Sequence, residues 1–220
     1  MLFRSAVSNS EGKLVVIDGV TLKVKRSIPL APLSEPLDVA LLPRDMGGLA
    51  TDTVVVSGAD GQVAFVNADT NAIIGTQHLG GVLQRLAVDP VGDALYVADA
   101  KTRIVYRFQA ADLARDPSTA DAHATSLAFA ARDLAAYDGT AFVPTTGGLM
   151  RLVGDAAPVV DASETSRTIN VVDPEVYPGG GILLMADDGL DHRNTDLVPV
   201  LHSRSEEHTS ELQSQFRISY

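Results

Sequence analysis

Residues 89–108 read DPVGDALYVADAKTRIVYRF, and this stretch contains the pattern that decides the fold. A turn rich in Asp, Pro and Gly comes first, followed by a short apolar run over residues 94–98. A four-residue polar turn at 99–102 separates this run from a second apolar run at 104–108. Polar turns between runs of Val, Ile, Leu and Tyr are typical of β-hairpins. The stretch therefore predicts two antiparallel strands joined by a tight turn.

The hairpin pattern occurs five times along the chain. In each copy a small residue stands directly before the polar turn, and these residues are Ser8, Ser57, Ala98, Pro144 and Ala186. They are spaced by 49, 41, 46 and 42 residues. A repeat of this length that consists of strands alone indicates the four-stranded blades of a β-propeller.

A further apolar run precedes most copies of the hairpin, at residues 39–43, 86–90, 134–138 and 170–174. Runs that are continuously apolar suit strands covered on both faces, so we expect these to be the innermost strands of their blades. Outer strands are predicted at residues 24–28 and 72–79. The predicted blade boundaries lie near Leu37, Leu83, Arg132 and Thr168.

The predicted fold class is all-β. We expect an incomplete β-propeller with about four four-stranded antiparallel blades, part of a larger ring of roughly six to eight blades. The segment Gln109–Ala131 interrupts the repeat and leaves two alternatives open. Its alanines favour an insertion with a helical turn, whereas Pro117 breaks any long helix and favours a frayed outer strand with a long loop.

The two ends of the chain differ from the rest of it. Residues 1–5 and 204–220 resemble the translation of the adapter DNA that is ligated to samples for short-read sequencing, in opposite orientations. We expect both ends to be adapter-derived, with residues 6–203 forming the partial propeller domain of a longer gene product. A segment as short and polar as 204–220 is expected to have no fixed place in the fold.

Two stretches carry a family resemblance. Residues 89–99, DPVGDALYVAD, and residues 61–75, GQVAFVNADTNAIIG, resemble the repeat of YVTN-type bacterial β-propellers. The resemblance departs at Arg107 and Phe108, where the usual Asp after the second strand is absent. It implies a bacterial repeat protein that is exported to the periplasm or the cell surface.

The composition excludes several classes of function. The chain has 17 Lys and Arg against 28 Asp and Glu, a net charge of −11, which repels phosphate backbones and disfavours nucleic acid as a partner. The chain contains no Cys, so thiolate catalysis and cysteine metal sites are excluded. No apolar run approaches the roughly 18 residues that span a bilayer.

Topology suggests one candidate ligand site. In a propeller, the residues that begin each innermost strand share a face with the first hairpin turn of each blade. The first group aligns as Asp38, Arg85, Asp133 and Ile169, and the turns supply Asp60, Asp99, Asp187 and Asp188. Together they would form a mainly acidic rim around the central channel. The alternative interpretation is that turns contain Asp for backbone reasons alone.

A second group of carboxylates lies close together in the sequence. Residues 187–196 read DDGLDHRNTD, and Asp187, Asp188, Asp191 and Asp196 are its candidate metal ligands. Hard cations such as calcium prefer oxygen ligands of this kind. The spacing does not match a calcium loop, however, so a solvated turn is the preferred interpretation and a divalent cation the alternative. No other cofactor is indicated.

The function predicted from these observations is that of a non-enzymatic binding or interaction scaffold, with a protein or a small molecule as its unidentified ligand. One alternative is a propeller enzyme such as a metal-dependent sugar-lactone hydrolase, in which carboxylates at the channel would hold the metal. A second alternative is a cell-surface adhesion or structural repeat protein.

Overall fold

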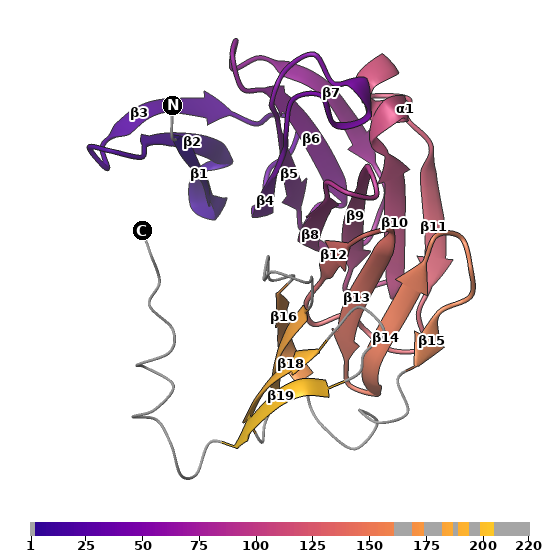
Figure 1. Ribbon diagram of the computed structural model, residues 1–220. Coiled ribbons are helices and arrows are strands. Elements are labelled where there is room, and N and C mark those ends of the chain that lie inside the picture. Colours follow the sequence, from indigo (N-terminus) through magenta and orange to yellow (C-terminus); the bar gives the residue numbers. More distant parts are fainter. Residues whose placement is uncertain (1–2, 161–168, 174–181, 187–188, 194–198, 205–220) are drawn as a thin grey trace.

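The computed structural model describes residues 3–160 and the strands at 169–173, 182–186, 189–193 and 199–204. These residues form five antiparallel sheets, one of three strands and four of four strands. Figure 1 shows the sheets following one another around an open arc. On its inner side lie β4 (Pro36–Leu42), β8 (Leu83–Asp89), β12 (Ala135–Tyr137) and β16 (Ile169–Asp173). The predicted all-β, incomplete β-propeller is confirmed.

Each sheet is a meander in which consecutive strands are hydrogen-bonded neighbours. The first sheet consists of β1 (Phe3–Ser8), β2 (Lys13–Asp18) and β3 (Val24–Pro29). The second consists of β4 (Pro36–Leu42), β5 (Thr53–Gly58), β6 (Gln62–Asn67) and β7 (Ile73–His78). The third consists of β8 (Leu83–Asp89), β9 (Ala94–Asp99), β10 (Ile104–Gln109) and β11 (Ala122–Ser126).

The last two sheets repeat this order. The fourth consists of β12 (Ala135–Tyr137), β13 (Thr140–Thr145), β14 (Gly148–Val153) and β15 (Val159–Val160). The fifth consists of β16 (Ile169–Asp173), β17 (Ile182–Ala186), β18 (Gly189–Arg193) and β19 (Pro199–Arg204). Two short 3₁₀ helices, η1 (Asn9–Glu11) and η2 (Met46–Gly48), lie in connections. Of the two ends assigned to adapter sequence, residues 3–5 lie in β1, Arg204 ends β19, and 205–220 lie outside the described residues.

The interrupted segment after β10 combines both alternatives that the sequence left open. A six-residue helix, α1 (Ala110–Arg115), follows β10 directly and ends before Pro117. The outer strand β11 comes next and pairs with β10 from Ile104↔Ser126 to Phe108↔Ala122. The insertion therefore adds a helical turn without removing the fourth strand. Within the described part of the chain, no helix is long and apolar enough to cross a membrane.

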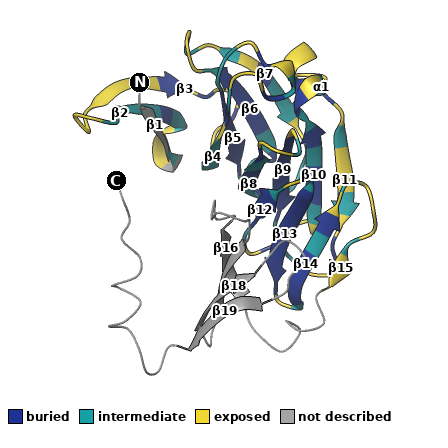
Figure 2. Cartoon of the chain, viewed as in Figure 1, coloured by how far each residue is buried: buried dark blue, intermediate teal, exposed yellow. Residues whose placement is uncertain are grey.

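Apolar side chains fill the spaces between consecutive sheets, and Figure 2 shows the buried residues concentrated in the central strands. The first and second sheets enclose a cluster that includes Leu14, Ile28 and Val54. The second and third enclose a larger cluster, in which the rings of Phe65 and Phe108 meet edge to face with centroids 6.2 Å apart. An aromatic pair of this geometry contributes about 1 kcal/mol beyond its buried area. A third cluster, around Tyr96 and Val143, joins the third sheet to the fourth.

A buried carboxylate also joins the third sheet to the fourth. Asp89 at the end of β8 is fully buried and accepts hydrogen bonds from the amides of Asp138 and Gly139, at 3.0 and 2.6 Å. The same carboxylate accepts from the amides of Val91 and Gly92, at 3.2 and 2.8 Å. Because buried N–H groups are costly to leave unpaired, this one side chain stabilises two turns from two sheets at once.

We expect Asp89→Ala to lower the free energy of unfolding by about 3 kcal/mol, because it leaves four turn amides from two sheets without their acceptor. The matched control is Asp116→Ala. Asp116 is exposed and bonds only to the neighbouring Ser118 and Thr119, so its loss should cost less than about 1 kcal/mol. Urea unfolding followed by circular dichroism measures both values. Equal losses in the two variants would contradict the role of Asp89.

Candidate functional site

Three of the predicted rim residues occupy the same position in consecutive sheets, Asp38 and Arg85 in inner strands and Asp133 two residues before β12. Asp38 lies opposite Ser57 in β5, and Arg85 lies opposite Ala98 in β9. In both sheets the register shifts by one residue just before this position, between Pro36 and Asp38 and between Leu83 and Arg85. Such bulges re-aim the side chain that follows them.

Asp133 occupies the equivalent place in the fourth sheet. The register runs Ala135↔Phe142 in β12 and β13, and an isolated bridge pairs Ala131 with Thr145. Continuing the β12 register back places Asp133 opposite Pro144, so a shift again precedes the position. In the fifth sheet Ile169 lies opposite Ala186, the counterpart of Ser57 and Ala98 in the sequence repeat, and the register shift follows this position instead of preceding it. The place of Ile169 at the rim stays a prediction.

The structure brings Arg85 and Asp133 together. The Nε of Arg85 lies 3.2 Å from the Oδ1 of Asp133, and their side chains are 40% and 18% exposed. Asp38 approaches the same strand, because its Oδ2 accepts a 2.9 Å hydrogen bond from the amide of Leu86. These contacts connect the second, third and fourth sheets along one line of polar groups beside the centre of the arc.

The carboxyl of Asp38 is partly buried between the second and third sheets. Burial raises the pKa of Asp38 above its usual 3.8, although the amides of Leu86 and Val39 and the charge of Arg85 act in the opposite direction. The charge of Asp133 adds to the rise. A carboxyl whose pKa is raised in this way is a typical feature of functional sites, but structural networks produce it as well.

Asp60 is accessible at the rim but is tied to the neighbouring loop. Its Oδ2 accepts from the amide and the hydroxyl of Ser34, at 2.9 and 3.1 Å, in the connection that leads into β4. It also accepts from the side-chain amide of Gln62, at 3.2 Å. The carboxylate therefore holds the β5–β6 turn against the preceding loop and retains partial exposure.

Asp99 plays a similar part in the next sheet but is fully buried. Its Oδ1 accepts from the amides of Val82, Lys101 and Thr102, at 3.0, 2.8 and 3.1 Å, and its Oδ2 accepts from the Thr102 hydroxyl. Gly81 packs so closely against this carboxylate that a Cβ at residue 81 would overlap it. Burial acts to raise the pKa of Asp99, but the hydrogen bonds outweigh it and hold the pKa below 3.8. Its burial leaves Asp99 no surface to offer a ligand.

The candidate metal ligands lie mostly outside the described residues. Asp187, Asp188 and Asp196 lie outside the described residues. Asp191 lies in β18, opposite Leu184 and His202. Within the described residues, no group of three or more His, Cys, Asp or Glu side chains could hold a metal ion. The cation site at residues 187–196 stays a prediction.

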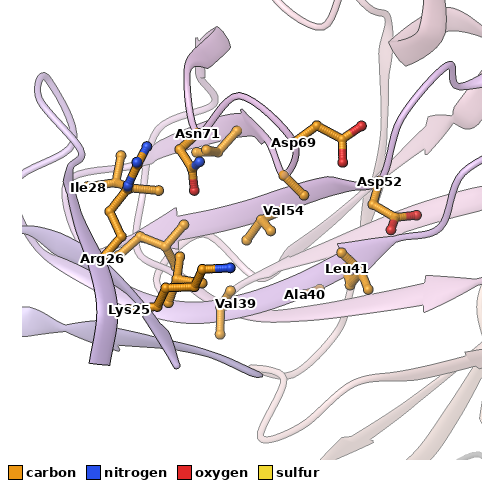
Figure 3. A pocket seen from close by; sticks show the side chains of 14 residues that line it. Lys25, Arg26, Ile28, Val39, Ala40, Leu41, Asp52, Val54, Asp69 and Asn71 are labelled. Atoms are coloured by element: carbon orange, nitrogen blue, oxygen red, sulfur yellow. The ribbon is translucent and has the colours of Figure 1, made fainter. Parts of the chain in front are cut away.

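The structure also contains a cavity that the sequence did not predict. A cavity of about 610 Å³ lies between the first sheet and the second, and Figure 3 shows its lining side chains. Lys25 and Arg26 of β3 stand on one side, and Asp52 and Asp69 stand on the opposite side. Residues from both sheets contribute, separated by up to 57 positions in the chain from Leu14 to Asn71, so no local sequence motif marks the cavity.

Comparison with known proteins supports the fold. No protein-family model and no curated protein sequence matches the chain. Among solved structures, BBS1N in complex with ARL6DN matches with a TM-score of 0.73 and 12% identity, over 93% of this chain and 64% of that chain. The dihydro-heme d1 dehydrogenase NirN, in complex with DHE, matches with a TM-score of 0.65 and 14% identity, over 93% and 44%. Sqt1 of Saccharomyces cerevisiae matches with a TM-score of 0.63 and 11% identity, over 84% and 52%.

These neighbours are β-propeller proteins, and the chain has the same fold. It spans less than two thirds of the length of each of the three. The neighbours include a complex with a protein partner and a dehydrogenase, so the fold by itself does not distinguish binding from catalysis. The YVTN resemblance, the bacterial source, export and the adapter origin of the ends stay predictions.

We expect Asp99→Asn and Asp38→Asn to change the pH dependence of stability in opposite ways. Asp99 has a lowered pKa, so its contribution is complete above pH 3.8 and is lost as the pH falls through the folded-state pKa. Asp38 has a raised pKa, so between 3.8 and that pKa the folded chain holds a proton that the unfolded chain lacks. Raising the pH through this range therefore removes stability.

Urea unfolding of the wild type and both variants from pH 3 to pH 7 measures the two effects. Relative to Asp99→Asn, the wild type should lose stability as the pH falls below about 4. Relative to Asp38→Asn, it should lose stability as the pH rises above about 4. If the stability difference between wild type and variant changed with pH in the same direction for both variants, the opposite pKa shifts of Asp38 and Asp99 would be disproved.

Proposed function

We propose that the chain is part of a non-enzymatic interaction scaffold and that its rim binds a cationic segment of a protein partner. The rim comprises Asp38, Arg85 and Asp133 with Asp60 beside them. The observation that carries the proposal is the placement of Asp38, Arg85 and Asp133 at one equivalent position of three consecutive sheets. They present a fixed row of charges at the point where propellers have their channel mouth.

The rigidity of the rim supports a binding role. Asp38 bonds to the next strand, Asp133 pairs with Arg85, and Asp60 bonds to the loop before β4. A site that is held in place before its partner arrives loses little side-chain entropy on binding. The fold neighbour BBS1N, crystallised in complex with ARL6DN, is an example of a propeller with a protein partner.

The sign of the charge favours a cationic partner. The rim contains three carboxylates and one guanidinium, which is paired with Asp133, and the whole chain has a net charge of −11. An acidic surface of this kind steers basic segments toward it and slows the approach of acidic ones. The carboxylates have the internal partners described above, which suits them better to long-range attraction than to holding a metal or transferring a proton.

We expect a decalysine peptide to bind the chain at low ionic strength, with Asp60→Asn/Asp133→Asn weakening its affinity at least about fivefold. Both substitutions keep a side-chain oxygen for the existing hydrogen bonds and remove two negative charges from the rim. Fluorescence anisotropy of a labelled peptide provides the measurement.

The matched control removes two exposed charges elsewhere, at Asp116 and Asp69. If Asp69→Asn/Asp116→Asn lowers the affinity for decalysine as much as the rim variant does, the attraction is due to net charge alone and the rim is not the site. If a decaglutamate peptide binds as well as decalysine, the proposed partner chemistry is wrong.

A further inference from the structure

The cavity between the first two sheets is a separate site from the rim, because none of the rim residues lines it. Its volume of about 610 Å³ lies within the range of about 300 to 1,000 Å³ that small-molecule sites occupy. Strands β2 and β3 form one wall, and β4, β5 and the end of β6 form the other. It is accordingly a cleft between two sheets.

The floor of the cavity is apolar. Leu14, Ile28, Val54 and Val66 line it and are themselves buried in the cluster between the two sheets. Leu41 of β4 also lines it, yet this side chain is 53% exposed. A ligand that covers apolar surface beside a buried cluster is stabilised by roughly 25 cal/mol per Å² of the surface removed from water.

The wall formed by β3 is cationic. Lys25 and Arg26 are exposed and adjacent on this strand, and Figure 3 shows the Lys25 side chain pointing into the cavity toward Val54. Cationic groups at the mouth of an apolar cavity, in a chain with a net charge of −11, mark a place where negative charge is favoured locally.

The carboxylates on the opposite wall already have partners. The Oδ2 of Asp69 lies 3.0 Å from the Nη2 of Arg44, and the Oδ1 of Asp52 accepts a 2.7 Å hydrogen bond from the amide of Arg44. The Arg44 guanidinium therefore offsets the charge of Asp69, and its backbone amide gives Asp52 a neutral donor. On the β3 side, the exposed guanidinium of Arg26 is the charge that would select the ligand.

We propose that this cavity binds an anionic amphiphile, namely a small carboxylate with an apolar body of fatty-acid or aryl type. The carboxylate lies against Arg26 and Lys25, and the apolar body covers Leu41, Val54 and Val66. Decanoate is the probe for this chemistry. Isothermal titration of the full chain with decanoate, below its micelle concentration, should show one saturable site.

Two variants test the two halves of the site. Arg26→Glu replaces the cation by an anion and should lower the affinity for decanoate about tenfold, as expected for the loss of a charge-assisted interaction. Ala68→Phe introduces a ring at an exposed lining position and should block the cavity without disturbing the buried cluster. Lys23→Glu is the matched control, since it makes the same change of charge on the same hairpin but does not line the cavity.

The outcomes separate the proposal from its alternatives. About tenfold weaker binding in Arg26→Glu and loss of binding in Ala68→Phe, with binding kept in Lys23→Glu, supports it. Decyltrimethylammonium that binds as tightly as decanoate would show that Arg26 does not select the charge, and the proposal would be overturned. It would also be overturned if decanoate did not bind and light scattering showed a dimer that Ala68→Phe dissociates, because the occupant would then be a second copy of the chain. The decalysine measurement at the rim is independent of every one of these results.

Discussion

The structure depends on sheets that bury both of their faces against their neighbours. In β5 and in β9 every residue is buried, so alternate side chains enter two different clusters, one on each side of the sheet. A strand with two apolar faces has no polar face on which to carry function. Polar chemistry is therefore confined to the ends of strands and to the turns between them, where Asp60, Asp89 and Asp99 are found.

The same confinement explains why so many of these carboxylates act structurally. Asp89 and Asp99 are fully buried at the ends of their strands, and each accepts several amide hydrogen bonds from turns. An uncompensated charge in that position would be strongly destabilising, whereas a carboxylate with three or four donors stabilises the turns around it. The rim residues differ in degree, because Asp60 and Asp133 have internal partners and still reach the surface. A site built from such groups is rigid before any partner binds.

The features that could be predicted from the sequence are those with a periodic and local signal. The spacing of Ser57, Ala98 and Pro144 predicted the repeated sheets, because a small residue before a tight turn recurs in every hairpin. The one-residue bulges before Asp38 and Arg85 were not predictable, since a bulge changes the register without changing the residue types and only the pairing shows it. The Asp89 contact to Gly139 and the cavity between the first two sheets were also out of reach. Both join residues from different sheets, and their geometry follows from packing rather than from any pattern along the chain.

The three spaces between the first four sheets are filled unequally, and this difference accounts for the cavity. Between the second and third sheets, Phe65 and Phe108 meet, and Leu113 of α1 adds a further large side chain. The cluster between the first and second sheets contains only aliphatic side chains, and strand β3 places Lys25 and Arg26 at the edge of the cavity. Two adjacent cations resist burial, since each would have to lose its water. The first sheet therefore packs against the second along Leu14 and Ile28 but remains open beyond them, and an anionic ligand with an apolar body is what would complete the contact.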